Sequence, residues 1–297
     1  MTLSRPIVHG LIRTGSLSPA RVIDAAGLTV TLGFIDVHSH AANGLAGALK
    51  EGRPLLAQGL TTVVLNPDGG GPIDIKAERA VFEKNGTGVN TALYVGHGSI
   101  RREVLGMADR APTAPELDRM IALARAGMDA GAIGLSMGPY YAPGSYAKTD
   151  ELVALAKVAA AGGGVFESHI RDEGDYSIGV VAAVQEVIQI ADEAKLPGIV
   201  AHMKALGPAS WGLSTAMVTR IRQARDRGVE VYADQYPYEA SGTSIVGALV
   251  PRWAEVGGMA ELRKRIDGRD RDRVLVDRFK NGDQSGSFLL EAQQPQP

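Results

Sequence analysis

The feature that most constrains this chain is a regular alternation of short apolar runs with helical patterns. Short apolar runs bounded by glycine or polar residues predict buried strands, and seven of them occur, at residues 34–40, 61–65, 90–95, 131–136, 164–169, 198–202 and 229–233. Apolar residues at helical spacing follow four of these runs, at residues 116–130, 150–161, 178–195 and 217–227, with Asp150 as a plausible N-cap of the second helix. Strands joined by helical crossovers run parallel, so the pattern predicts a parallel α/β sheet.

A parallel sheet of this kind can be an open doubly wound sheet or a closed barrel. No G-x-G-x-x-G motif follows the first predicted strand, which removes the usual support for a dinucleotide-binding fold. Polar and ionisable residues instead recur at the C-terminal ends of successive strands, where barrels place their chemistry. We therefore predict an α/β fold of the (β/α)₈ TIM-like barrel type.

The patterns in the first and last segments of the sequence predict an incomplete barrel. Residues 1–32 are enough for only a remnant of a small β domain, residues 33–280 form the barrel domain, and residues 281–297 predict a disordered tail. After Pro251 a charged helical stretch covers residues 261–280, and no convincing eighth strand follows. Seven strands leave open edges on the first and seventh, so we expect marginal stability and a tendency to pair with other chains.

Composition excludes several classes of protein. The chain has 297 residues, 45% of them hydrophobic, with a net charge of −2, which allows a large core but gives no basic face for nucleic acid or for an anionic membrane surface. It has no cysteine, so disulfides, thiolate ligands and cysteine nucleophiles are excluded. No apolar run reaches the roughly 18 residues of a membrane span, and no secretory signal precedes Gly10. We expect a cytoplasmic protein.

Four of the six histidines fall at the ends of predicted strands. His38 and His40 are two residues apart at the end of the first strand, so their imidazoles share one face. His169 and His202 end the fifth and sixth strands. A histidine at a strand end is often only a hydrogen-bonded loop residue, but four on strands of one barrel indicate a site for zinc or a similar ion.

Five motifs, taken in order, resemble those of a known family. They are Gly33-Phe-Ile-Asp-Val-His-Ser-His40, the segment from Gly131 to Ala147, Ser168-His-Ile-Arg-Asp-Glu-Gly174, Ala201-His-Met-Lys204 and Asp234-Gln-Tyr-Pro-Tyr-Glu-Ala-Ser241. The first resembles the opening motif of the amidohydrolase superfamily, and the others resemble its D-aminoacylase branch. The resemblance extends to about Pro251. It implies a metal-dependent hydrolase barrel, here without the eighth strand and most of the small β-sandwich domain.

The resemblance also implies a metal-binding residue set. His38 and His40 would hold one position for zinc or another divalent ion, and His169 and His202 a second. Where the family usually has a cysteine near both positions, this chain has Asp68. A carboxylate can replace the thiolate but is harder, which shifts the preference somewhat away from zinc. Pro67-Asp68-Gly69 is equally a strong turn sequence, so a plain turn residue is the alternative.

The same resemblance suggests residues that bind substrate. Lys204 would pair with the substrate carboxylate, with Tyr141 and Ser241 nearby, although a solvated lysine, a packed tyrosine and a loop serine are the alternatives. His97 could face the pocket in a supporting role or cap its loop. For Arg171 and Glu173 we predict a local ion pair with each other.

The function implied is hydrolysis of the linear amide bond of N-acyl-D-amino acids, with a small molecule as the only partner. In the superfamily the proton acceptor is an aspartate at the end of the eighth strand, and no residue of this chain matches it. The catalytic residue therefore stays unassigned. Without a positioned proton acceptor we expect slow turnover. One alternative is a cyclic-amide hydrolase, which is disfavoured because Ser136 and Met137, and no lysine, end the fourth strand. Another is a barrel that binds metal without catalysis.

Overall fold

The protein is described here by a computed structural model, which covers residues 26–274. Within them seven parallel strands form one sheet in chain order: β1 (Phe34–Asp36), β2 (Leu60–Leu65), β3 (Asn90–Gly96), β4 (Gly134–Met137), β5 (Val165–Ser168), β6 (Gly198–Val200) and β7 (Val231–Ala233). Every strand pairs only with its neighbours along the chain, so all crossovers pass on one side, as in a barrel wall. The predicted parallel α/β sheet is confirmed.

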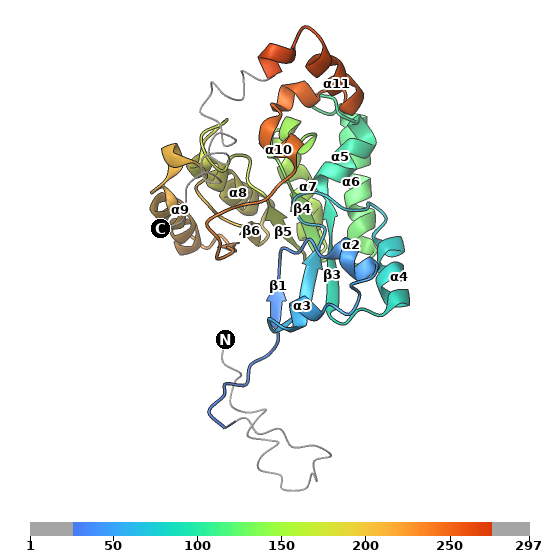
Figure 1. Cartoon of the computed structure of the whole chain (residues 1–297), viewed down its shortest axis with the longest axis vertical. Helices are drawn as coiled ribbons and strands as arrows, with labels where there is room; N and C mark the ends of the chain where they lie inside the picture. Colours follow the sequence, from blue (N-terminus) through green and yellow to red (C-terminus); the bar gives the residue numbers. More distant parts are fainter. Residues whose placement is uncertain (1–25, 275–297) are drawn as a thin grey trace.

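Helices cover the outer side of this sheet (Figure 1). The main ones are α4 (Ile75–Asn85), α5 (His97–Leu105), α6 (Ala114–Asp129), α7 (Thr149–Ala161), α8 (Val180–Ala194) and α9 (Ser214–Asp226). Consecutive helices from α5 to α9 pack side by side, and the main core lies between them and the strands. Shorter helices α2 (Ala42–Ala46), α3 (Arg53–Leu56), α10 (Ile245–Leu249) and α11 (Met259–Asp267) complete the described chain, with three 3₁₀ turns at Gly144–Tyr146, Pro208–Ser210 and Arg252–Glu255.

The sheet has two open edges among the described residues, on β1 and β7, as predicted. The prediction that the first strand is buried was wrong in part. Phe34 and Ile35 are 58% and 63% exposed, because β1 has a neighbour on one side only and no described helix covers its start. Tyr232 on β7 is also 46% exposed. Apolar side chains on unpaired edges are the feature that favours association with another chain.

Two local details of the helices differ from expectation. Asp150 is not the N-cap of α7; Lys148 holds that position, and the Asp150 carboxylate accepts a hydrogen bond from the amide of Glu151 inside the first turn. Helix α6 begins instead with a reciprocal cap, in which the Glu116 carboxylate accepts hydrogen bonds from the amide and hydroxyl of Thr113.

Part of the predicted domain organisation lies outside the described residues. This holds for most of the remnant domain at residues 1–32, for the tail at residues 281–297 and for the end of the charged stretch 261–280, of which α11 is the described part. These assignments stay predictions. Within residues 26–274, no helix combines the length and the hydropathy that a membrane crossing requires.

Candidate metal centre

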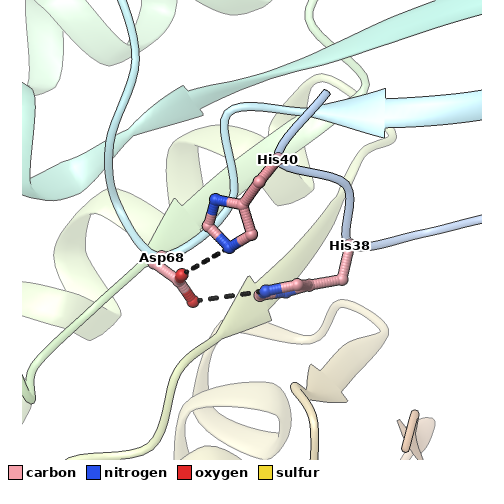
Figure 2. Close-up of side chains that lie close together, drawn as sticks. All are labelled: His38, His40 and Asp68. Atoms are coloured by element: carbon pink, nitrogen blue, oxygen red, sulfur yellow. Dashed lines mark ion pairs between the residues drawn. The ribbon is translucent and has the colours of Figure 1, made fainter. Parts of the chain in front are cut away.

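The candidate site lies just beyond the C-terminal ends of the strands, because the chain turns there in tight, glycine-rich loops. After β1 the backbone stays near β2, where the Ser39 amide donates to the Val64 carbonyl at 2.9 Å. After β2, Asn66 and Asp68 both adopt left-handed φ angles, of 64° and 59°. These two residues turn the chain back across the end of β2. The turn places the Asp68 carboxylate beside the histidines that follow β1 (Figure 2).

His38, His40 and Asp68 form the first group of potential metal ligands. The Asp68 Oδ1 atom is 3.6 Å from His38 Nε2, and its Oδ2 atom is 3.2 Å from His40 Nε2. Figure 2 shows both imidazoles pointing at the same carboxylate. Asp68 is thus a turn residue, and the left-handed turn directs its carboxylate at the two imidazoles. A turn position and a role as a potential ligand are therefore compatible.

His169, Glu173 and His202 form the second group. The Glu173 Oε1 atom is 3.1 Å from His202 Nδ1 and 3.7 Å from His169 Nε2. The other ring nitrogen of His202, Nε2, is 3.6 Å from Asp68 Oδ1. The two groups thus meet at Asp68 and His202, in the arrangement expected of two neighbouring cation positions.

The pKa values of the two acidic residues are set by burial and by the imidazole and ammonium groups around them. Burial alone would raise the pKa of Asp68, but contacts with His202 and His40 hold it well below its usual range. Burial would likewise raise the pKa of Glu173, yet His169, His202 and Lys204 lower it to about 2. Both carboxylates are therefore ionised at neutral pH.

The imidazoles respond to the same charges. Burial would lower the pKa of His202, but contacts with Asp68 and Glu173 raise it to about 9. For His40 the contact with Asp68 also raises the pKa. Burial lowers the pKa of His169 to about 4 and is the main cause of the lowered pKa of His38. His38 and His169 are thus shifted toward the neutral form, whereas the proton bound to His202 at pH 7 would compete with a metal ion for the ring nitrogen.

The residues fit a divalent metal ion. Among the described side chains, His38 Nε2 and Asp68 Oδ1 are buried without a hydrogen-bond partner, although they face each other. Buried polar atoms in proteins are almost always paired, so an unpaired imidazole nitrogen beside an unpaired carboxylate oxygen suits a shared cation. Imidazole and carboxylate donors together bind zinc and other first-row divalent ions.

A cavity of about 220 Å³ opens directly onto both groups. It is lined by His38, His40, Asp68, Tyr140, Tyr141, His169, Glu173, His202, Lys204, Tyr236, Ser241, Gly242 and Thr243. The structure therefore brings together all the residues that the sequence suggested for metal or substrate, with one exception. His97 does not reach the cavity: it is fully buried at the start of α5, with Nε2 2.8 Å from Glu151 Oε1.

Lys204 is held at the wall of this cavity. Its Nζ atom pairs with the Glu173 carboxylate, lies 2.9 Å from His202 Nδ1 and is 5.4 Å from the centre of the Tyr236 ring. The hydroxyl of Tyr141 lies 3.0 Å from Thr243 Oγ1, which joins the β4 loop to the segment after β7. The predicted pairing of Arg171 with Glu173 was wrong. Arg171 instead forms a two-point ion pair with Glu186 on α8, which leaves Glu173 to the cavity.

Three acidic residues for which we predicted no role in the site lie close to it in the structure. Glu167 contacts His38, Glu173 belongs to the second group, and Asp234 accepts a hydrogen bond from the His202 amide at 2.6 Å. Glu173 and Asp234 stand inside the motifs that carry the family resemblance, and Glu167 directly precedes one of them. An available signal for Glu167 and Glu173 was spacing, because each is within four residues of His169.

Comparison with known proteins identifies clear relatives of this chain. The D-aminoacylase of Alcaligenes xylosoxydans xylosoxydans is 32% identical over 302 residues, which cover 90% of this chain and 60% of that protein. The N-acyl-D-glutamate deacylase of the same organism is 36% identical over 258 residues, 78% of this chain and 51% of that protein. Over most of its length this chain is similar to that D-aminoacylase and to that N-acyl-D-glutamate deacylase. It spans about half to three fifths of the length of these relatives, and no family model matches it.

Solved structures of family members share the fold. The N-acyl-D-glutamate deacylase of Bordetella bronchiseptica, complexed with zinc and a phosphonate inhibitor, has a TM-score of 0.65 at 36% identity and covers 69% of this chain and 47% of its own. A D-aminoacylase described as having a binuclear metal centre has a TM-score of 0.66 at 28% identity, covering 82% and 58%. The predicted barrel of the metal-dependent hydrolase type is thereby confirmed as the fold class.

Proposed function

We propose that this chain carries the metal site of a hydrolase that cleaves the linear amide bond of N-acyl-D-amino acids. The observation that carries the proposal is the convergence of two metal-capable groups and one lysine on a single cavity of about 220 Å³. The family relatives named above act on N-acyl-D-amino acids, which agrees with a cavity that offers both cation sites and a fixed ammonium group.

In this proposal His38, His40 and Asp68 hold one divalent ion, zinc or a related metal, and His169 and His202, with Glu173, hold a second. When bound, such an ion activates water and polarises an amide carbonyl. Asp68 faces both groups and is therefore the residue that would contact both ions. The carboxylate in place of a thiolate makes manganese, cobalt or nickel reasonable occupants alongside zinc.

The remaining cavity residues would bind and orient the substrate. The Lys204 ammonium group pairs with the free carboxylate of the substrate, and Glu173 keeps that ammonium in place before the substrate enters. The side chains of Tyr141 and Ser241 line the cavity from two different segments of the chain, where they can contact the acyl-amino-acid chain. The partner is thus a small molecule; the balanced charge of the chain supports no nucleic-acid role, and a cytoplasmic location stays a prediction.

A cyclic-amide hydrolase is the weaker candidate. A lysine at the end of β4 would be needed there as a bridge between two metals, and Ser136 occupies that place. Its hydroxyl donates to the Asn66 carbonyl at 2.6 Å and accepts from the Gly69 amide at 3.1 Å, so it serves the turn that aims Asp68. A linear amide therefore fits this site better than a ring.

The test is hydrolysis by the purified protein loaded in turn with zinc, manganese, cobalt and nickel. N-acetyl-D-leucine, N-acetyl-L-leucine and dihydrouracil are compared, and we expect measurable turnover of the first alone. Lys204→Met should then raise KM about 10- to 100-fold, the worth of a hydrogen-bonded charge pair. The control Lys195→Met removes an exposed lysine that pairs with Asp192. Turnover of dihydrouracil in preference, or no turnover with any metal bound, would reject the proposal.

A further inference from the structure

Glu167 is an ionisable residue in the interior of the barrel wall. It stands on β5 between Phe166 and Ser168, and it is 0% exposed. It does not line the cavity, so it does not contact a substrate there. An ionisable side chain with no access to solvent needs specific partners, because burial of an unpaired carboxylate is costly.

Both partners of this carboxylate belong to the first ligand group. Glu167 Oε1 is 2.9 Å from His38 Nδ1, and Oε2 accepts a hydrogen bond from the backbone amide of Asp68 at 3.2 Å. The backbone amide of His38 is fixed separately, by donating to Asp36 Oδ1 at 3.0 Å. Glu167 therefore controls the ring of His38 and the position of the Asp68 loop at the same time.

We propose that Glu167 is a positioning residue that sets His38 in the tautomer needed to bind a metal. The inference rests on the proposed metal site, but it does not depend on the substrate or on turnover. A neutral imidazole carries one proton, and the carboxylate keeps that proton on Nδ1. The lone pair of Nε2 is then free, and Nε2 is the atom that faces Asp68 Oδ1 without a hydrogen-bond partner. A carboxylate behind a metal-binding histidine has this effect on both tautomer and ring orientation.

Glutamine cannot replace the carboxylate, although it has the same shape. In the proposed tautomer both partners present a proton donor to Glu167, and an amide has only one accepting oxygen. If the amide oxygen accepts from the Asp68 backbone, its NH₂ group donates to His38 Nδ1 and moves the imidazole proton to Nε2. If the amide is flipped, its NH₂ group faces the Asp68 amide and displaces that loop. In the first arrangement His38 Nε2 is protonated and cannot bind a metal, and in the second Asp68 is moved out of position.

The experiment compares Glu167→Gln with the unchanged protein, using zinc alone as the probe. Zinc affinity is measured by competition with a chromophoric chelator, and the tautomer of each histidine by long-range ¹H–¹⁵N correlation in metal-free protein labelled at histidine. Removal of such an outer partner weakens metal binding about 10- to 100-fold. We expect that loss together with a change of His38 from the Nδ1–H to the Nε2–H tautomer. The hydrolysis assay takes no part, so failure of the proposed substrate would leave this result readable.

Glu151→Gln is the matched control. Glu151 is also a buried glutamate, 4% exposed, that bonds an imidazole and a second donor, His97 and Arg101, but it is not part of the cavity. Zinc affinity unchanged in Glu167→Gln, or reduced equally in both variants, would overturn the proposal. If Glu167→Gln does not fold, the tautomer of His38 in the unchanged protein decides: Nδ1–H supports the proposal, and Nε2–H refutes it.

Discussion

Zinc binding should weaken steeply as the pH falls, because the metal must displace a proton from His202. The pKa of that imidazole is raised to about 9, chiefly by Asp68 against the opposing effect of burial. A raised pKa means that the proton is bound at every pH below 9. Each pH unit below the pKa corresponds to about 1.36 kcal/mol, so removal of this proton at pH 7 costs a free energy of about 2.7 kcal/mol. Zinc affinity at pH 7 is therefore expected to be about 100-fold below its value at pH 9 and to change about tenfold per pH unit.

The assay is a zinc titration by competition with a chelator of known proton affinity at pH 6.0, 7.0 and 8.0. Titration calorimetry in two buffers with different ionisation enthalpies measures the protons released at each pH. We expect at least one proton per bound zinc at pH 7, and more if His40, whose pKa is also raised, binds the same ion. The control variant Asp192→Asn removes an exposed carboxylate that pairs with Lys195 and should reproduce the unchanged slope.

Asp68→Asn separates this explanation from a general effect of pH. Loss of the Asp68 charge removes the largest contribution that raises the pKa of His202, so fewer protons compete with zinc in this variant. Its affinity should be lower at pH 8, since a ligand is lost, but its dependence on pH should be shallower. An unchanged zinc affinity between pH 6 and 8 in the original protein would refute the reasoning, and so would an equally steep slope in Asp68→Asn.

Two further predictions concern stability, both measured by urea unfolding of metal-free protein. Thr113→Ala removes one side of the cap at the start of α6 and should lower the free energy of unfolding by about 1 kcal/mol, whereas an effect below about 0.3 kcal/mol would mean that the cap contributes nothing. Phe166→Ala leaves a cavity beside Gly198 in the core and should cost about 3–5 kcal/mol; the surface substitution Val81→Ala on α4 should cost much less, and equal losses would contradict the placement of the core.

The order of strands and helices was predictable because it depends on local patterns. Apolar runs of five to seven residues and glycines near their ends marked all seven strands, and each observed strand lies within or beside its predicted range. Helix α4 was not predicted, since Ile75 and Phe82 are its only buried residues and leave a weak apolar stripe. The exposure of Phe34 and Ile35 also escaped prediction, because burial on an edge strand depends on what lies beyond it in the fold.

The four histidines of the candidate metal centre were easier to predict than their partners. His38, His40, His169 and His202 stand next to strand ends, so the barrel topology alone brings them together. Which carboxylate meets which cation depends on side-chain direction after irregular loops. Glu173 was predicted to pair with Arg171, but Arg171 turns outward to Glu186, and Glu173 turns inward to Lys204 and His202. The spacing of these residues in the sequence does not show which partner each side chain will contact.

Asp68 connects the chemistry of the site to the shape of its loop. An aspartate in the left-handed region is more tolerable than most side chains, and the Ser136 hydroxyl and the Glu167 carboxylate hold the backbone at both sides of the turn. That turn is what places one oxygen of Asp68 3.6 Å from both His38 and His202, which follow β1 and β6, two strands far apart in the sheet. A longer or uncharged side chain in the same turn would lose either the reach or the charge. The carboxylate at this position is therefore suited to lie between two cation positions. The buried side chains of Ser136 and Glu167 stabilise the turn that places it there.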